Sequence, residues 1–372
     1  RGYGLDDRLP ETPAGITVSE AFLPSLSGSR SASAMMSYIG AARYTYADKY
    51  TFTSSYRYDG ASLSSVPDKN RWHGFYSVGA MWDVKQEEFL QASDLIADLR
   101  IRASFGQTAS PFGSSFAYLP TYGVNTSYGG QQGIRPNNIG NPDFDWEYVD
   151  EFNTGFDLSL LPSRRINIEF DWYNRITKNM FIDQPLSATS GASSALLSTG
   201  KMRNRGVELK VGADIIKNDQ FTWNVGINGG YNNNTILRVT DITDELPDGD
   251  TRIIKVGLPY GTYFAPRWAG VNPENGEAQY YNADGTIVNV YNEEEQAVPL
   301  DASLYPKLTG GISTSLSWKE LTLSGLLSFV SDVQRWNNID FYNENQAYMT
   351  SNQSKRMLYD RWKKPGDIAE LQ

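Results

Sequence analysis

The sequence lacks several features that define common classes of protein. Its 372 residues include no cysteine and a single histidine, His73. The absence of cysteine excludes a disulfide framework and thiolate metal sites. There is no run of about 18 consecutive apolar residues, so a transmembrane helix is excluded as well. A membrane β-barrel stays possible, because only every second residue of its strands faces lipid.

Catalytic and metal-binding signatures are also missing. The sequence contains no GxSxG, GxGxxG or HExxH motif and no P-loop. His73 lies beside an expected loop without catalytic partners, and the acidic run 241–250 does not have EF-hand spacing. We therefore expect a non-enzymatic protein with no metal site and no cofactor. The net charge of -10 argues against a nucleic-acid partner.

What the sequence does contain is strict two-residue alternation. Val207, Leu209 and Val211 alternate with Glu208 and Lys210, and the pattern continues to Ala213 and Ile215. Such alternation is typical of β-strands with two different faces. Ten strands of this kind are predicted, at 37–46, 50–59, 75–84, 98–108, 151–160, 165–175, 206–215, 221–228, 307–318 and 321–330.

The two faces of these strands differ in charge. In a soluble antiparallel sheet the apolar face packs on a core and the polar face meets water, which would explain any single pair of strands. Across all ten, however, the charges fall on one face, while Tyr and Trp gather near the strand ends of the other. A Lys or Arg facing the lipid midplane would cost about 2–4 kcal/mol. We therefore predict a membrane barrel with Val207, Leu209, Val211, Ile168, Phe170, Trp223 and Val225 toward lipid. The residues predicted to face the interior are Arg57, Asp59, Arg100, Arg102, Glu169, Asp171, Arg175, Glu208, Lys210 and Asp214.

The connections alternate in length. Short turns are expected at 47–49, 161–164, 217–220 and 319–320, and the connection 84–97 should contain one helical turn at 86–91. Long loops rich in Gly, Asn, Ser and Tyr occupy 60–74, 110–145, 176–204, 232–306 and 331–372. Short periplasmic turns and long extracellular loops are typical of an outer-membrane barrel. The loop 232–306 also contains a hairpin, indicated by Asn275–Gly276 and Asp284–Gly285.

Several stretches, taken in order, carry a family resemblance. They are "YADKYTFTSSYRYDGAS", "ASDLIADLRIRASFGQTAS", "NPDFDWEYVDEFNTGFDLSLL", "FDWYNRITKNMFIDQPLSATSGASS", "TGKMRNRGVELKVGADII" and "RWAGVNPENGEAQYYNADG". Together they resemble the SusC-like (SusC/RagA) family of TonB-dependent outer-membrane transporters found in Bacteroidota-type bacteria. The resemblance implies an all-β fold, a transmembrane antiparallel barrel of 22 strands. Residues 1–372 would supply about ten of these, as a portion without the plug, the N-terminal domain and the last strands.

The resemblance also implies partners and cargo. A SusD-like surface lipoprotein would cap the extracellular mouth, and the TonB complex would act through the plug. The surrounding solvent would be outer-membrane lipid, and the cargo would be oligosaccharides or peptides. The charged interior would dock the plug or line a solute path. Aromatic residues of the long loops are candidates for contacts to cargo or lid: Tyr118, Tyr122, Tyr128, Trp146, Tyr263, Trp268, Tyr280 and Tyr281.

Two other functions are compatible with the strand pattern alone. A passive porin-like channel would share the barrel but have no plug. A soluble extracellular glycan-binding β-protein would use the same alternation around a dry core.

Overall fold

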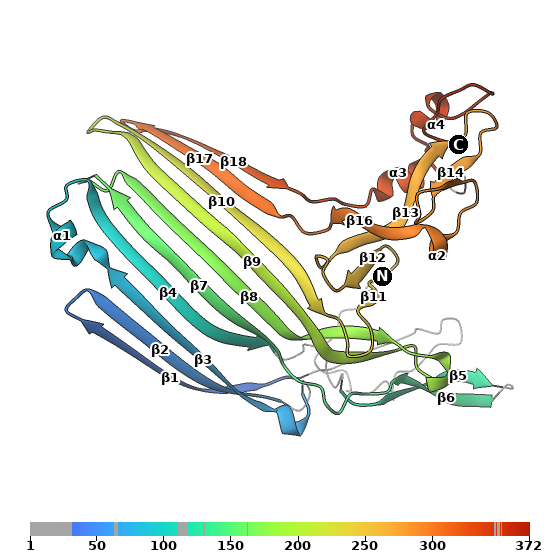
Figure 1. Cartoon of the computed structure of the whole chain (residues 1–372), viewed down its shortest axis with the longest axis horizontal. Helices are drawn as coiled ribbons and strands as arrows, with labels where there is room; N and C mark the ends of the chain where they lie inside the picture. The colour runs from blue at the N-terminus through green and yellow to red at the C-terminus, as the bar shows by residue number, and fades with distance from the viewer. Residues whose placement is uncertain are drawn as a thin grey trace, which may run out of the picture.

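The main feature of the fold is one long antiparallel sheet (Figure 1). The computed structural model describes residues 32–62, 66–110, 118–128, 131–161, 163–345, 347, 350 and 352–372. Ten strands are paired in the order β1-β2-β3-β4-β7-β8-β9-β10-β17-β18. Their bounds are β1 Met35–Tyr46, β2 Tyr50–Ala61, β3 Trp72–Asp83, β4 Ile96–Ser110, β7 Glu147–Leu160, β8 Ile166–Pro185, β9 Ser194–Lys217, β10 Phe221–Arg238, β17 Leu308–Trp318 and β18 Leu321–Ser331. The prediction of ten strands is confirmed.

Tight turns join the strands at one end of the sheet, the left end in Figure 1. At the β1–β2 turn, Ala47 and Asp48 both have positive φ, 53° and 56°. The Lys49 amide closes this turn by donating to the carbonyl of Tyr46 at 3.0 Å. Two consecutive left-handed residues form a type I′ turn, whose twist matches that of the flanking strands. The short turns therefore fix the register of the paired strands.

One side chain is placed differently from the sequence prediction. Alternation predicts that Ile215 continues the apolar face after Ala213. In the structure a register shift pairs Asp214 with Asn224 but Ile216 with Trp223. The extra residue forms a β-bulge, so Ile216, and not Ile215, lies opposite Trp223 on the apolar face.

The connection 84–97 folds around a carboxylate. It contains the 3-10 turn η2 (Val84–Gln86) and the short helix α1 (Glu88–Gln91), which agrees with the helical turn predicted there. Glu87 accepts hydrogen bonds from Lys49 Nζ at 2.9 Å, Tyr50 Oη at 2.6 Å and Trp82 Nε1 at 3.1 Å. These donors, the Tyr50 hydroxyl first, lower the pKa of Glu87 to about 2. A single carboxylate thus joins the β1–β2 turn to the end of β3.

The other end of the sheet contains extended strands and a hairpin in addition to loops. Residues 176–204, predicted as a loop, mostly continue β8 and β9 beyond the neighbouring strands, with the 3-10 turn η3 (Ala188–Ser190) near the tip. The prediction of a loop was wrong there, because the pairing runs on through bulges beside Met180. The region 110–145 contains the hairpin β5 (Thr121–Tyr128) and β6 (Gln131–Asn138).

A second sheet lies at this same end, on the right in Figure 1. Its six strands are β11 Glu245–Pro247, β12 Arg252–Lys255, β13 Thr262–Val271, β14 Ala278–Tyr281, β15 Ile287–Val288 and β16 Ala297–Ser303. The short helices α2 (Glu293–Gln296), α3 (Asn338–Asn343) and α4 (Arg356–Tyr359) and the 3-10 turn η1 (Asp68–Asn70) complete the elements. β14 and β15 pair around the Asp284–Gly285 turn.

Two small hydrophobic clusters hold the long-loop end together. One contains Met180, Ile182, Ile236, Val239, Leu246 and Ile254, and joins the β8–β10 strands to the second sheet. The other contains Ala61, Val66, Phe75, Phe144 and Trp146. Apolar burial of this kind offsets the entropy of ordering long connections.

No helix in the described residues is long and apolar enough to span a membrane.

The carboxylate of Glu87 predicts a defined pH response. Replacing Glu87 with Gln removes the charge that Lys49 pairs with, so we expect a lower thermal midpoint for the complete protein in detergent at pH 7. The folded-state pKa is depressed, so this stabilisation is fully present above about pH 4.5 and is lost as the pH falls toward about 2. The difference between wild type and variant should shrink over that range. Glu88→Gln, at an exposed neighbour with no described ion pair, is the control. A difference that grows on acidification would contradict the assignment.

Candidate functional site

The strand register gathers the charged residues on one face of the main sheet. Glu169 lies opposite Lys210, and Asp171 lies opposite Glu208. Following the register from strand to strand places all ten residues predicted to face the interior on this face: Arg57, Asp59, Arg100, Arg102, Glu169, Asp171, Arg175, Glu208, Lys210 and Asp214. Successive side chains of a strand point to opposite faces. Pairing of the ten strands in register therefore places their polar residues together on one face of the sheet.

Arg102 is the central cation of this charged face. It donates to the carboxylates of Asp157 and Asp171, the latter at 2.5 Å, and so bridges β4, β7 and β8. Next to it, Lys210 binds Glu169 at 2.9 Å. Charge-assisted hydrogen bonds of this kind are stronger than neutral ones, although all these groups keep partial contact with solvent.

The other sequence-predicted charges form further pairs, some within one strand and some between neighbouring strands. Arg57 binds Asp59 at 2.6 Å, and Arg175 binds Glu151 at 3.0 Å. Arg100 binds Asp98 at 3.0 Å. Asp214 accepts from Asn224 and from Lys217, at 2.9 and 3.2 Å. Glu208 forms no ion pair with any described residue. It lines a hollow of about 650 Å³ together with Glu169, Lys210 and Asn228.

The opposite face has the complementary composition. On this face Phe156 of β7 packs against Phe170 of β8, with ring centroids 5.6 Å apart, and Ile227 of β10 lies opposite Ile312 of β17. In the described strands this face carries no charged side chain from the short turns up to Tyr231 in β10 and Trp172 in β8. A large exposed surface of aromatic and aliphatic residues marks a face that contacts another apolar phase or molecule, so we predict that this face meets lipid and that the charged face lines the barrel interior.

Two of the aromatic candidates are not available for contacts to cargo or lid. Trp146 is fully buried and donates from Nε1 to the carbonyl of Asn70 at 2.7 Å. Tyr263 is 6% exposed, and its hydroxyl donates to the carbonyl of Gln334. Both predictions are corrected: these rings pack the long-loop end, because a large aromatic group with one polar atom fills a core whose backbone supplies a partner.

Three aromatic rings, two of them exposed, meet beside strands β13 to β15 of the second sheet. Trp268 and Tyr280 pair across β13 and β14 with centroids 5.3 Å apart, and Tyr280 contacts Tyr291 at the same distance. We call Trp268, Tyr280 and Tyr291 the aromatic platform. Trp268 is 47% exposed and Tyr291 is 55% exposed. Such rings supply contact area at low entropic cost, so the platform can grip a partner or a cargo.

The remaining candidates are dispersed. Tyr281 lies under the guanidinium of Arg267, which is 5.3 Å from its ring centroid. Tyr118 packs partly buried against the Trp146 cluster. Tyr122 is 62% exposed on β5, and Tyr128 ends that strand, with its side chain outside the described part of the structure. The predicted set therefore does not form one site.

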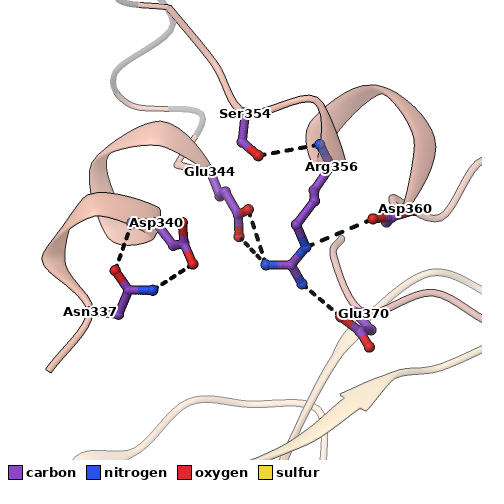
Figure 2. A network of polar contacts seen from close by, with 7 residues as sticks. All are labelled: Asn337, Asp340, Glu344, Ser354, Arg356, Asp360 and Glu370. Atoms are coloured by element: carbon purple, nitrogen blue, oxygen red, sulfur yellow. Dashed lines mark hydrogen bonds and ion pairs between the residues drawn. The ribbon is translucent and has the colours of Figure 1, made fainter. Parts of the chain in front are cut away.

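Figure 2 shows a polar network around Arg356 that the sequence did not predict. Arg356 at the start of α4 binds Glu344 at 3.1 Å, Glu370 at 2.6 Å and Asp360 at 3.8 Å. Arg356 and Glu370 also line a hollow of about 580 Å³ that Trp268 borders. The segment 332–372 has no hydrophobic period, so only the tertiary structure reveals this contact.

These observations define the class of protein. A sheet with one uncharged, aromatic face and one charged face, joined by tight turns at one end and by folded loops at the other, is a wall of a membrane β-barrel. The family described as "TonB dependent receptor-like, beta-barrel" matches residues 4–354, and the chain belongs to that family. It is therefore an outer-membrane chain, and its relatives come from Bacteroidota.

Relatives with names support the same assignment. The TonB-dependent receptor P3 of Formosa agariphila is 30% identical over 64% of this chain and 24% of its own length. The TonB-dependent receptor SusC of Bacteroides thetaiotaomicron is 26% identical over 78% of this chain and 30% of its own length. A solved structure of the RagAB peptide transporter superposes with a TM-score of 0.81 and 28% identity, covering 91% of this chain and 38% of that chain. The chain thus spans about a quarter to two fifths of the relatives it matches.

The two faces make opposite predictions for labels at adjacent residues. The chain has no cysteine, so single Cys substitutions can carry a spin label without background. A label at Leu209→Cys should be relaxed by oxygen, which concentrates in lipid, and one at Lys210→Cys should be relaxed by a water-soluble nickel chelate. The controls are Ile168→Cys and Glu169→Cys on the next strand. An exchanged pattern, or both labels shielded by protein, would overturn the assignment of the faces.

Removing the central cation should destabilise the sheet. Arg102→Gln leaves two carboxylates near each other with no cation between them, so we expect a loss of about 1–3 kcal/mol in unfolding free energy. Denaturant unfolding of the complete protein in detergent measures it. Arg43→Gln is the matched control, because Arg43 is exposed on the same face without a described ion pair, and it should change stability by less than about 0.5 kcal/mol. Adding Asp157→Asn and Asp171→Asn to the Arg102 variant should restore most of the loss. No rescue would mean that the charges are not the cause.

Proposed function

We propose that the protein is the barrel component of a SusCD-type importer, which moves oligosaccharides or peptides across the outer membrane with energy from the TonB complex. The observation that carries the proposal is the match of 91% of this chain to the RagAB peptide transporter at a TM-score of 0.81, over a sheet whose two faces are sorted for lipid and water. The SusC relative adds support. No covalent chemistry is required for this activity.

The charged face gives the barrel its role in transport. Paired charges such as Arg102 with Asp171 and Lys210 with Glu169 keep the interior hydrated without leaving strong isolated fields. A hydrated interior surface of this kind releases polar cargo easily. It also lets the plug break and re-form its contacts with the barrel. TonB acting on the plug would then open the path, while the wall stays fixed by its backbone pairing.

The aromatic platform is the contact that we assign to the surface lipoprotein. Trp268 lies on β13, Tyr280 lies on β14 and Tyr291 follows β15. The second sheet is at the long-loop end, and that end faces outside the cell in this family. The Arg356 network holds the segment around α4 beside Trp268. A rigid aromatic surface of this kind fits a folded lid better than it fits a flexible ligand, because it requires little ordering on binding.

Membrane closure supports a complete barrel larger than this sheet. Within the described residues, β1 and β18 each pair on one side only. Unpaired backbone groups at a strand edge cost several kcal/mol each in lipid. We therefore propose that both edges pair with further strands of the same barrel, in line with the small share of each relative that the chain spans.

Energy dependence separates an importer from a passive channel. Cells whose copy of the complete protein is deleted should stop taking up large oligosaccharides or peptides, and the restored protein should recover uptake. A protonophore should abolish the recovered uptake, because TonB draws on the inner-membrane proton gradient. Uptake that persists in the protonophore would favour a porin-like channel.

The lid contact has its own test. Trp268→Ala with Tyr280→Ala should weaken co-purification of the lipoprotein by about tenfold or more, since interface aromatic residues often contribute more than about 2 kcal/mol each. Tyr122→Ala, at an exposed tyrosine on another hairpin, is the control and should leave co-purification unchanged. Equal loss in both variants would show that the platform has no special role.

A further inference from the structure

The outward face becomes positively charged where its lipid-facing band ends. On β9 the outward positions run from Ile216 to Val207 without a charge, and the next outward residues are Arg205, Arg203 and Lys201. At roughly 3.3 Å per residue and a strand tilt of about 40°, the uncharged run spans roughly 20–25 Å, close to the usual apolar band of about 25 Å. The basic residues therefore begin at the level of the outer-leaflet headgroups.

Neighbouring strands place the same boundary at aromatic rings. At this level the outward face carries the rings of Phe152 in β7, Trp172 in β8 and Tyr231 in β10, each between 38 and 45% exposed. Aromatic belts of this kind mark the level where acyl chains meet headgroups. Beyond the belt lie the neutral polar residues Asn174 and Asn233, directly opposite Arg205 on its two sides.

The three cations on the outward face of β9 have no carboxylate partner among the described residues. Arg203, Arg205 and Lys201 form no ion pair with any described residue, whereas most cations of the charged interior face have a carboxylate partner. Arg205 is exposed and Arg203 is half-buried. Nearby on the same face, Lys178 binds Asp150 at 2.6 Å and lies over the Tyr148 ring.

The local charge is opposite to that of the whole chain. Four cations, Lys178, Lys201, Arg203 and Arg205, lie on this part of the outward face with one carboxylate, Asp150, which gives four minus one, or +3, against -10 for the chain. Such a patch attracts anions, and a planar guanidinium with several donors is well matched to phosphate.

We propose that Arg203 and Arg205, with Lys201, form a binding site for the phosphate groups of outer-leaflet lipid. The proposed ligand is a phosphorylated lipid rather than free phosphate. The basic patch continues directly from the lipid-facing band, where the acyl chains of the same lipid molecule would pack. The site would hold the barrel wall at a fixed height beside the long-loop end. This inference depends on the orientation of the faces and not on the cargo or on energy coupling.

The test uses the complete protein in detergent micelles and purified lipid A as the probe, with binding measured by fluorescence titration. Arg203→Gln with Arg205→Gln should weaken lipid A binding by about tenfold or more, because each basic residue near an anionic surface adds to the attraction. Arg203→Lys with Arg205→Lys should retain most of the binding. The matched control is Arg164→Gln with Lys217→Gln, which removes two exposed cations, 61% and 57% exposed, at the short-turn end, and it should bind lipid A like the wild type.

Two further experiments distinguish a lipid phosphate from free phosphate as the ligand. Dephosphorylated lipid A should bind wild type and the Gln variant alike, and millimolar inorganic phosphate should not displace lipid A. Equal lipid A affinity in wild type and the Gln variant would overturn the proposal. Displacement by inorganic phosphate would also overturn it, in favour of a soluble anion site. Heat-modifiable migration on gels checks folding, and Arg205→Gln alone replaces the double variant if that fails to fold. A protein that binds lipid A as predicted but fails to import cargo would leave this inference standing while refuting the proposed function.

Discussion

The structure depends on one constraint, which is that every backbone N–H and C=O group must be paired where there is no water. Ten strands satisfy it by continuous antiparallel pairing, with register shifts confined mainly to strand ends, such as the bulge at Ile215. Once the backbone is paired, side chains have only two directions available. The apolar set then takes one face and the charged set takes the other, so lipid contact and a wet interior come from the same hydrogen-bonded ladder.

The same constraint is relaxed beyond the membrane, and the long-loop end is built by different means. There, side-chain clusters replace strand pairing as the main source of order. Ile236 and Met180 join β8 and β10 to the second sheet, and Trp146 with Phe144 closes the space under the β2–β3 connection. These clusters bury some aromatic residues of the long-loop end and leave others exposed, among them Trp268.

Electrostatics separates the two faces further. Charges on the interior face are mostly neutralised by ion pairs within and between strands, with Arg102 bridging three strands. On the outward face charge is absent within the lipid-facing band and then returns as unpaired cations at Arg203 and Arg205. Paired charges suit a surface that must exchange contacts during transport, whereas unpaired cations suit a surface that keeps a single kind of anionic neighbour.

The sequence by itself determined the ten strands, the two faces and the family, because a period of two is a local property that each strand expresses alone. It also indicated the aromatic loops, but it could not sort them: Trp146 and Trp268 were both candidates for partner contacts, yet one is buried and the other exposed. The extension of β8 and β9 through residues 176–204, the bulge at Ile215 and the Arg356 network likewise required the tertiary structure. Each depends on contacts between residues far apart in the chain, and polar loop sequences carry no period that encodes them.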